Sequence, residues 1–156
     1  MTGIDEVLVV FDVSGSFHEL GKQHLLEYLG DAIANAEEMD WFQVQLRMYT
    51  WSDKVIESDD IPPVLSGHGT AEVKALKQFL ANVTNHQAVL LISDGLFGIF
   101  RDKSLMLLTQ NMGRRFQIIA AGYDADISTL KKMSKNVQYA ENMVSILRIM
   151  TEKKID

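Results

Sequence analysis

The sequence contains no cysteine. That absence excludes disulfide bonds, thiolate zinc sites and a cysteine nucleophile. Basic residues are also few, because 15 Lys and Arg stand against 21 Asp and Glu, which gives a formal net charge of −6 at pH 7. An acidic chain without a Lys/Arg cluster is poorly suited to holding a phosphate backbone. We therefore expect no nucleic-acid partner.

Long hydrophobic runs are missing as well. No apolar stretch approaches the roughly 20 residues that a membrane-spanning helix needs, and no basic segment followed by an apolar one comes after Met1. Together with the missing cysteines, these absences predict a cytoplasmic protein with no membrane partner. The short length and the lack of an export signal favour a bacterial source.

What is present predicts one packed domain. The chain has 156 residues, of which 47% are hydrophobic, a size and composition typical of a single globular unit spanning residues 1–156. The run Val7–Phe11 is short, apolar and rich in β-branched valine, and Ala88–Ile92 is similar. Such runs are typical of strands that are buried on both faces of a parallel sheet.

Strand and helix patterns alternate along the whole chain. We expect strands over about 7–11, 44–50, 54–57, 88–92, 116–121 and 137–140, and helices over about 19–38, 73–80, 102–112, 127–134 and 143–153. In the first helix, His24 and Tyr28 fall on the stripe that helical spacing would bury. The alternation predicts an α/β protein, a Rossmann-like three-layer α/β/α sandwich. Its central sheet would be mostly parallel, with one antiparallel edge strand in the hairpin of residues 44–57.

Three segments place oxygen-bearing side chains where the chain leaves a strand or enters a helix. Asp12, Ser14 and Ser16 follow the first strand, Thr70 follows a glycine-rich loop, and Asp94 follows the strand 88–92. Because the carboxyl ends of parallel strands share one edge of a sheet, these side chains are expected to converge. Carboxylate and hydroxyl oxygens suit Mg²⁺ or Mn²⁺. Taken singly, each segment also fits a helix cap or an ordinary turn.

The three segments in this order resemble the von Willebrand factor A domain family and its metal-ion-dependent adhesion site (MIDAS). The resemblance spans essentially the whole chain and rests on Asp12-x-Ser14-x-Ser16, on Thr70 and on Ser93-Asp94-Gly95. It implies that the three hydroxyls bind Mg²⁺ or Mn²⁺ and that the two aspartates bind it directly or through water. It further implies an open metal position for an Asp or Glu carboxylate of a partner protein.

Some residues depart from the family pattern. His68 lies inside the glycine-rich loop, and Ala71 follows Thr70 where related domains often carry an acid. The segment after Asp94 is unusually apolar. One interpretation is that Phe17, His68, Leu96 and Phe97 form a partner-binding rim around the metal. The other is that Phe97 packs under the following helix.

The resemblance favours a stand-alone, non-enzymatic adaptor or scaffold whose partner is another protein, for example part of a AAA+ ATPase system. Two alternatives remain open. The metal could be only structural in a chain that forms homo-oligomers. The chain could also be a phosphatase of the haloacid dehalogenase type, with Asp12 as the nucleophile. In that case Ser14 stands where that family has its proton-donating aspartate, and Lys103 or Lys132 would bind the phosphate.

Overall fold

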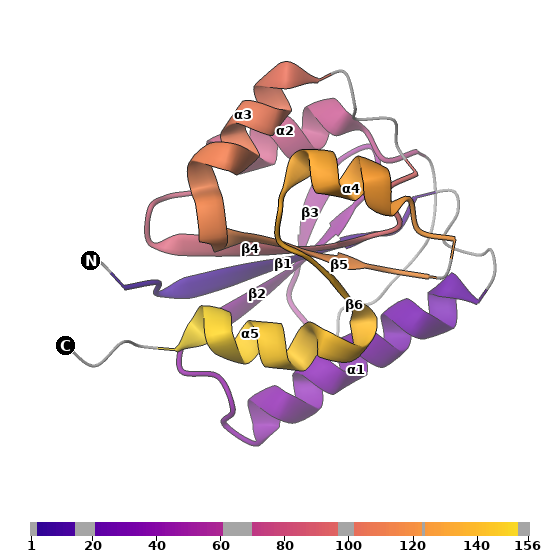
Figure 1. Cartoon of the computed structure of the whole chain (residues 1–156). Coiled ribbons are helices and arrows are strands. Elements are labelled where there is room, and N and C mark those ends of the chain that lie inside the picture. The colour runs from indigo at the N-terminus through magenta and orange to yellow at the C-terminus, as the bar shows by residue number, and fades with distance from the viewer. Residues whose placement is uncertain (1–2, 15–20, 61–69, 97–101, 123, 153–156) are drawn as a thin grey trace.

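A computed structural model describes residues 3–14, 21–60, 70–96, 102–122 and 124–152. Six strands form one sheet in the order β3-β2-β1-β4-β5-β6, with helices on both faces (Figure 1). Neighbouring strands run parallel except β2 and β3, which pair antiparallel at the edge of the sheet. The predicted sandwich and its antiparallel edge hairpin are confirmed.

The elements lie close to the predicted ranges. The strands are β1 Glu6–Asp12, β2 Gln45–Trp51, β3 Val55–Ser58, β4 Gln87–Ser93, β5 Phe116–Ala120 and β6 Val137–Tyr139. The α-helices are α1 Lys22–Glu38, α2 Val73–Ala81, α3 Lys103–Met112, α4 Ile127–Met133 and α5 Met143–Thr151. Short 3₁₀ turns, η3 Gly113–Arg115 and η4 Ala140–Asn142, precede β5 and α5.

The hydrophobic core has two parts, one on each face of the sheet. Residues of α1 and α5 pack with Val7, Val9 and Phe11 on one face. Residues of α2, α3 and α4 pack with Leu8 and Val10 on the other face. Figure 1 shows α1 and α5 below the sheet and the other three helices above it. The side chains of β1 alternate between two buried surfaces, which explains why its sequence is continuously apolar.

Helix α1 differs from its predicted start and stripe. It begins at Lys22, after Gly21 in a left-handed conformation with φ of 73°, and residues 15–20 lie outside the described part. Tyr28 is 68% exposed and the His24 side chain 87% exposed, so their predicted burial was wrong. The buried face runs instead through Lys22, Leu26, Leu29 and Ile33. The first residue of this buried face, Lys22, is charged.

Strand β4 is followed by a glycine turn that lies against the start of α4. Gly95 has φ of 76°, and a Cβ at this position would lie 2.8 Å from the backbone oxygen of Asp126. The close approach accompanies a hydrogen bond of 2.7 Å from the Asp126 N–H to the Asp94 carbonyl. The start of α4 is therefore held against the end of β4.

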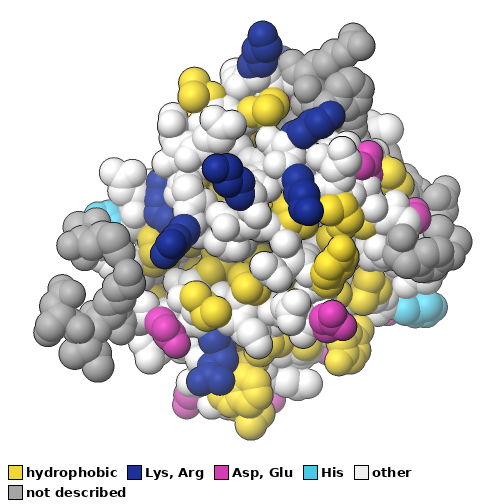
Figure 2. Space-filling view, in the orientation of Figure 1, with side chains coloured by type: hydrophobic (Ala, Val, Ile, Leu, Met, Phe, Trp, Pro, Cys, Tyr) yellow, Lys and Arg dark blue, Asp and Glu magenta, His cyan; other side chains and the backbone are white. Residues whose placement is uncertain are grey.

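The surface carries mixed charge. On the face shown in Figure 2, Lys and Arg side chains are spread out, with other side chains between most of them. Within the described ranges, no helix combines the length and the apolar composition that crossing a membrane requires.

The cap of α3 provides a first test. The Asp102 Oδ1 atom accepts a hydrogen bond of 3.0 Å from the Leu105 N–H. This bond, together with weaker contributions from Ser104 and Lys77, lowers the pKa of the Asp102 carboxyl. Asp102→Ala should reduce the free energy of unfolding by about 1 kcal/mol at neutral pH. Asp102→Asn keeps an acceptor and should lose less.

Acid adds a second readout for the same pair. An acid whose pKa is lower in the folded state stabilises the fold above its unfolded pKa and loses that contribution as the pH falls through the folded value. Below about pH 4, the difference between the wild type and Asp102→Asn in chemical denaturation should therefore shrink. A difference that is constant with pH would contradict this assignment.

The Gly95 turn provides a second prediction. Gly95→Ala should destabilise the protein more than Gly21→Ala, by at least about 1 kcal/mol, because it adds a contact with the Asp126 backbone to the strain of positive φ. Gly21 is the matched control, since its φ is 73° and a Cβ there would meet no described residue within 4 Å. Equal losses in thermal unfolding would show that the contact is not restrictive.

Candidate metal centre

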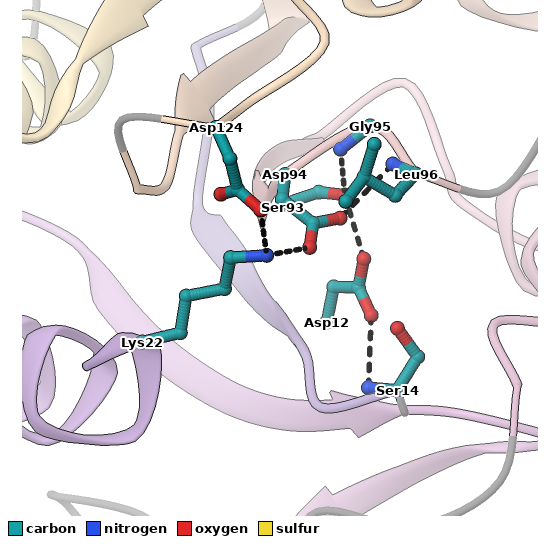
Figure 3. A network of polar contacts seen from close by, with 8 residues as sticks. All are labelled: Asp12, Ser14, Lys22, Ser93, Asp94, Gly95, Leu96 and Asp124. Carbon is teal, nitrogen blue, oxygen red and sulfur yellow. Dashed lines mark hydrogen bonds and ion pairs between the residues drawn. The ribbon is translucent and has the colours of Figure 1, made fainter. Parts of the chain in front are cut away.

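The centre is built where β1 and β4 end side by side. The two strands pair in parallel with Phe11 opposite Ile92, so Asp12 and Ser93 follow at the same edge. There the Ser93 hydroxyl donates a hydrogen bond of 2.7 Å to the Asp12 Oδ2 atom (Figure 3). The predicted convergence of the segments after these two strands is thus seen directly in this bond.

Asp12 is a buried carboxylate held in a fixed orientation. It is 6% exposed, and its Oδ1 atom accepts a hydrogen bond of 3.0 Å from the Ser14 N–H. Burial raises the pKa of the Asp12 carboxyl, the hydrogen bonds from Ser93 and Ser14 act against that rise, and the charge of Asp94 adds to it. The two carboxylate oxygens have four lone pairs, and the hydrogen bonds from Ser93 and from the Ser14 backbone and side chain leave capacity for one more ligand.

Asp94 is equally buried, at 4% exposure. Its Oδ1 atom accepts a hydrogen bond of 3.0 Å from the Leu96 N–H, while the Gly95 N–H donates to the Ser93 hydroxyl at 3.1 Å. The turn after β4 therefore uses its own backbone to orient both side chains. The remaining oxygen, Oδ2, faces a residue that sequence reasoning did not identify.

That residue is Lys22, in the first turn of α1. Its ammonium lies 2.6 Å from the Asp94 Oδ2 atom and 2.9 Å from the Asp124 Oδ2 atom, and the lysine side chain is 3% exposed. Figure 3 shows the three side chains pointing toward one another from α1, the end of β4 and the loop after β5. Burial acts to lower the pKa of Lys22, but the hydrogen bonds to Asp94 and Asp124 reverse this, and the net shift is upward.

A signal for Lys22 was present in the sequence. The spacing of Lys22, Leu26, Leu29 and Ile33 is that of one helix face. The predicted stripe, which includes Tyr28, lies on a neighbouring face of the helix, and Lys22 does not belong to it. A lysine that begins an apolar stripe, close to the end of a strand that carries an aspartate, indicates a buried charge near that aspartate.

Thr70 lies before α2 and is exposed. Its hydroxyl donates a hydrogen bond of 3.0 Å to the Glu72 Oε1 atom. The Glu72 N–H donates to the Ser52 carbonyl at 2.8 Å, and β2 pairs with β1 so that Trp51 lies opposite Asp12. The start of α2 is thus attached to the same edge of the sheet. An acid is present here, one position beyond Ala71.

Ser14 is buried, and its N–H contacts Asp12, while its role as a metal ligand stays a prediction. Ser16, Phe17, His68 and Phe97 lie outside the described residues, so their predicted roles stay predictions. Leu96 is described and is 50% exposed. An apolar side chain at the edge of the centre is compatible with the proposed rim.

The donor set fits a hard divalent cation. Its described members offer two carboxylates and hydroxyl oxygens, which Mg²⁺ and similar ions prefer over nitrogen or sulfur. Within the described part of the chain, no three His, Cys, Asp or Glu side chains are grouped so that they would hold a metal. The predicted set needs only two such residues, because its other ligands are hydroxyls. One further polar atom lies nearby: Asp124 Oδ1 is buried and has no hydrogen-bond partner among the described residues.

Comparison with known proteins bears on the fold. No protein-family model matches the sequence, and no curated protein matches it. Solved structures do match. A von Willebrand factor type A protein from Catenulispora acidiphila aligns with a TM-score of 0.60 at 13% identity, over 96% of this chain and 42% of that one. This chain thus spans less than half the length of that relative.

Two other matching structures hold metals. Manganese-loaded TRAP protein of Plasmodium vivax aligns with a TM-score of 0.68 at 13% identity, over 96% of this chain and 74% of that one. Proximal thread matrix protein 1 from the mussel byssus, with a zinc-occupied MIDAS motif, aligns with a TM-score of 0.60 at 15% identity, over 95% and 46%. At such identities the likeness establishes the architecture. This chain has the fold of a von Willebrand factor A domain.

Proposed function

We propose that this chain is a non-catalytic protein-interaction module that binds Mg²⁺ or Mn²⁺ at the edge described above. The ligands are Asp12, Ser14, Ser16, Thr70 and Asp94, and the metal binds an Asp or Glu carboxylate of a partner protein. The observation that carries the proposal is the pair of buried aspartates at the adjoining ends of β1 and β4. The matching folds with manganese and with zinc in a MIDAS motif support a divalent cation in general.

The charge balance explains why a partner carboxylate would bind. Hydroxyl ligands are neutral, so the two carboxylates balance the charge of the divalent cation without making it negative, and an open coordination position can still accept an anion. At 4 Å, two unit charges attract by about 1 kcal/mol in bulk water and by about 4 kcal/mol at an effective dielectric constant near 20. A partner that excludes water from the edge therefore strengthens the attraction, and the half-exposed Leu96 offers an apolar contact beside it.

Metal binding is the direct test. Mn²⁺ titrated calorimetrically into metal-stripped protein should show one site. Asp12→Asn should weaken binding by at least about tenfold, since even indirect partners of metal ligands contribute that much. Asp5→Asn is the control, because it removes the same charge from an exposed residue before β1. Equal affinity in all three proteins would contradict the proposal.

The partner chemistry has its own readout. Acetate supplies the carboxylate that the partner would bring, so adding acetate should strengthen Mn²⁺ binding to the wild type, and Mn²⁺ should strengthen acetate binding by the same factor. Chloride at equal ionic strength is the control. An effect of acetate no larger than that of chloride would argue for a metal without an open position.

Asp12→Asn should also show how much the buried Asp12 carboxylate destabilises the metal-free protein. Because burial raises the pKa of Asp12, its ionisation destabilises the metal-free folded state, and this loss sets in as the pH rises from the unfolded value of 3.8 through the raised folded value. Metal-free Asp12→Asn, measured by urea denaturation at neutral pH, should be at least as stable as the wild type. A clear loss of stability would mean that the Asp12 carboxylate is structural.

A further inference from the structure

Lys22 is unusual because a charged side chain lies almost fully inside the protein beside the proposed metal ligands. Both Lys22 and Asp94 are more than nine-tenths buried, and their charged atoms are 2.6 Å apart. Removing two charges from water is costly, and a buried ion pair regains that energy only with good geometry and additional hydrogen bonds. A hydrophobic residue at this helix position would complete the stripe of Leu26, Leu29 and Ile33 without that cost. The lysine therefore calls for a functional explanation.

The atom that Lys22 contacts is informative. Asp94 has one oxygen bonded to the Leu96 N–H, and the other, Oδ2, holds the lysine ammonium. The ammonium is thus a cation on a carboxylate that the proposed function assigns to a metal. Asp94 lies close enough to Asp12 for its charge to raise the pKa of that carboxyl, and it shares the Lys22 ammonium with Asp124.

The second partner of Lys22 provides an alternative position for it. Asp124 binds the ammonium through Oδ2 at 2.9 Å, while its Oδ1 atom is buried and has no hydrogen-bond partner in the part of the chain that the structure describes. An ammonium that left Asp94 could give Oδ1 the donor it lacks. Gly122 leaves room for this pair, since a Cβ at that position would lie 3.1 Å from the Lys22 Cε atom and 3.0 Å from Asp124 Oδ1.

We propose that Lys22 is a built-in competitor for the metal. In the metal-free protein its ammonium neutralises Asp94, and a divalent cation must displace it from Oδ2, whereupon it moves fully onto Asp124. The proposal rests on the proposed function, because it takes Asp94 to be a ligand. Lys22 thereby sets how tightly the site binds the metal. It also couples the metal to the first turn of α1.

Replacing the lysine tests the competition. Lys22→Met retains length and removes the charge, so Mn²⁺ should bind on the order of tenfold more tightly than to the wild type. Lys77→Met is the matched control. It removes the same charge from another Lys–Asp pair, Lys77 and Asp102 at 3.3 Å, and it should change affinity by less than about twofold because exposed charges are screened by salt. Thermal unfolding with and without Mn²⁺ should show a larger stabilisation by metal for Lys22→Met than for the wild type.

The outcomes separate the two proposals. If wild type and Lys22→Met bind Mn²⁺ with equal affinity, or if both lysine variants tighten it equally, the competition is refuted while the metal site stands. If neither folded protein binds Mn²⁺, with or without acetate, the proposed function is refuted and the competition with it. Binding only after Lys22 is replaced would support the competition strongly.

A measurement on the wild type covers the case in which Lys22→Met does not fold. The ¹⁵Nζ and ¹³Cε signals of lysine side chains can be followed by NMR during a titration with Mg²⁺, which is diamagnetic. The buried Lys22 signal should move and saturate together with the metal, while the Lys77 signal should stay in place. A Lys22 signal unchanged at saturating Mg²⁺ would overturn the proposal, because the ammonium would then not have left Asp94.

Discussion

The parallel pairing of β1 with β4 is the constraint on which this structure depends. It places Phe11 opposite Ile92 and so brings Asp12 and Ser93 to the same edge, although 81 positions separate them in sequence. A shift of one residue in either strand would turn every side chain to the opposite face. The two core clusters on the two faces of β1 prevent such a shift, because each contains alternate residues of that strand. The geometry of the centre is thus secured by apolar packing along the strands that lead into it.

The polar side chains at this edge of the sheet are held in place by hydrogen bonds to their own segments. Each aspartate is oriented by the backbone of the residues that follow it: Asp12 by the Ser14 N–H and Asp94 by the Leu96 N–H. Ser93 links the two segments by donating to Asp12 and accepting from Gly95. The fixed orientation lowers the reorganisation needed when a ligand binds, which is the usual advantage of a supported site. The negative charges of Asp94 and Asp124 are paired with the ammonium of Lys22, which comes from α1.

Much of this could be predicted from the sequence. The apolar runs of β1 and β4 are long enough to indicate two strands of a parallel sheet. The polar residues that follow each run indicate the edge that the two strands share. The hairpin of β2 and β3 followed from strict alternation. These features are local, and their physical causes act within a few residues. The alternation of strands and helices then restricted the possible topologies.

Helical spacing could indicate that Lys22 is buried but not what surrounds it, because its environment is made by three segments distant in sequence. Nothing near Lys22 in the sequence indicates that Asp94 and Asp124 will surround it. Helical periodicity was ambiguous between two adjacent stripes, and aromatic Tyr28 favoured the wrong one. Likewise, the contact of Thr70 with Glu72 depends on side-chain rotamers that no spacing rule specifies.

The measurement that tests the central claim most directly is anomalous diffraction from crystals of the protein soaked in Mn²⁺, recorded near the manganese absorption edge. The account predicts one strong peak within coordination distance of Asp12 and Asp94, with the Lys22 ammonium closer to Asp124 than to Asp94. A strong peak elsewhere, or no peak in crystals whose edge is free of lattice contacts, would contradict the assignment of this edge as a metal site.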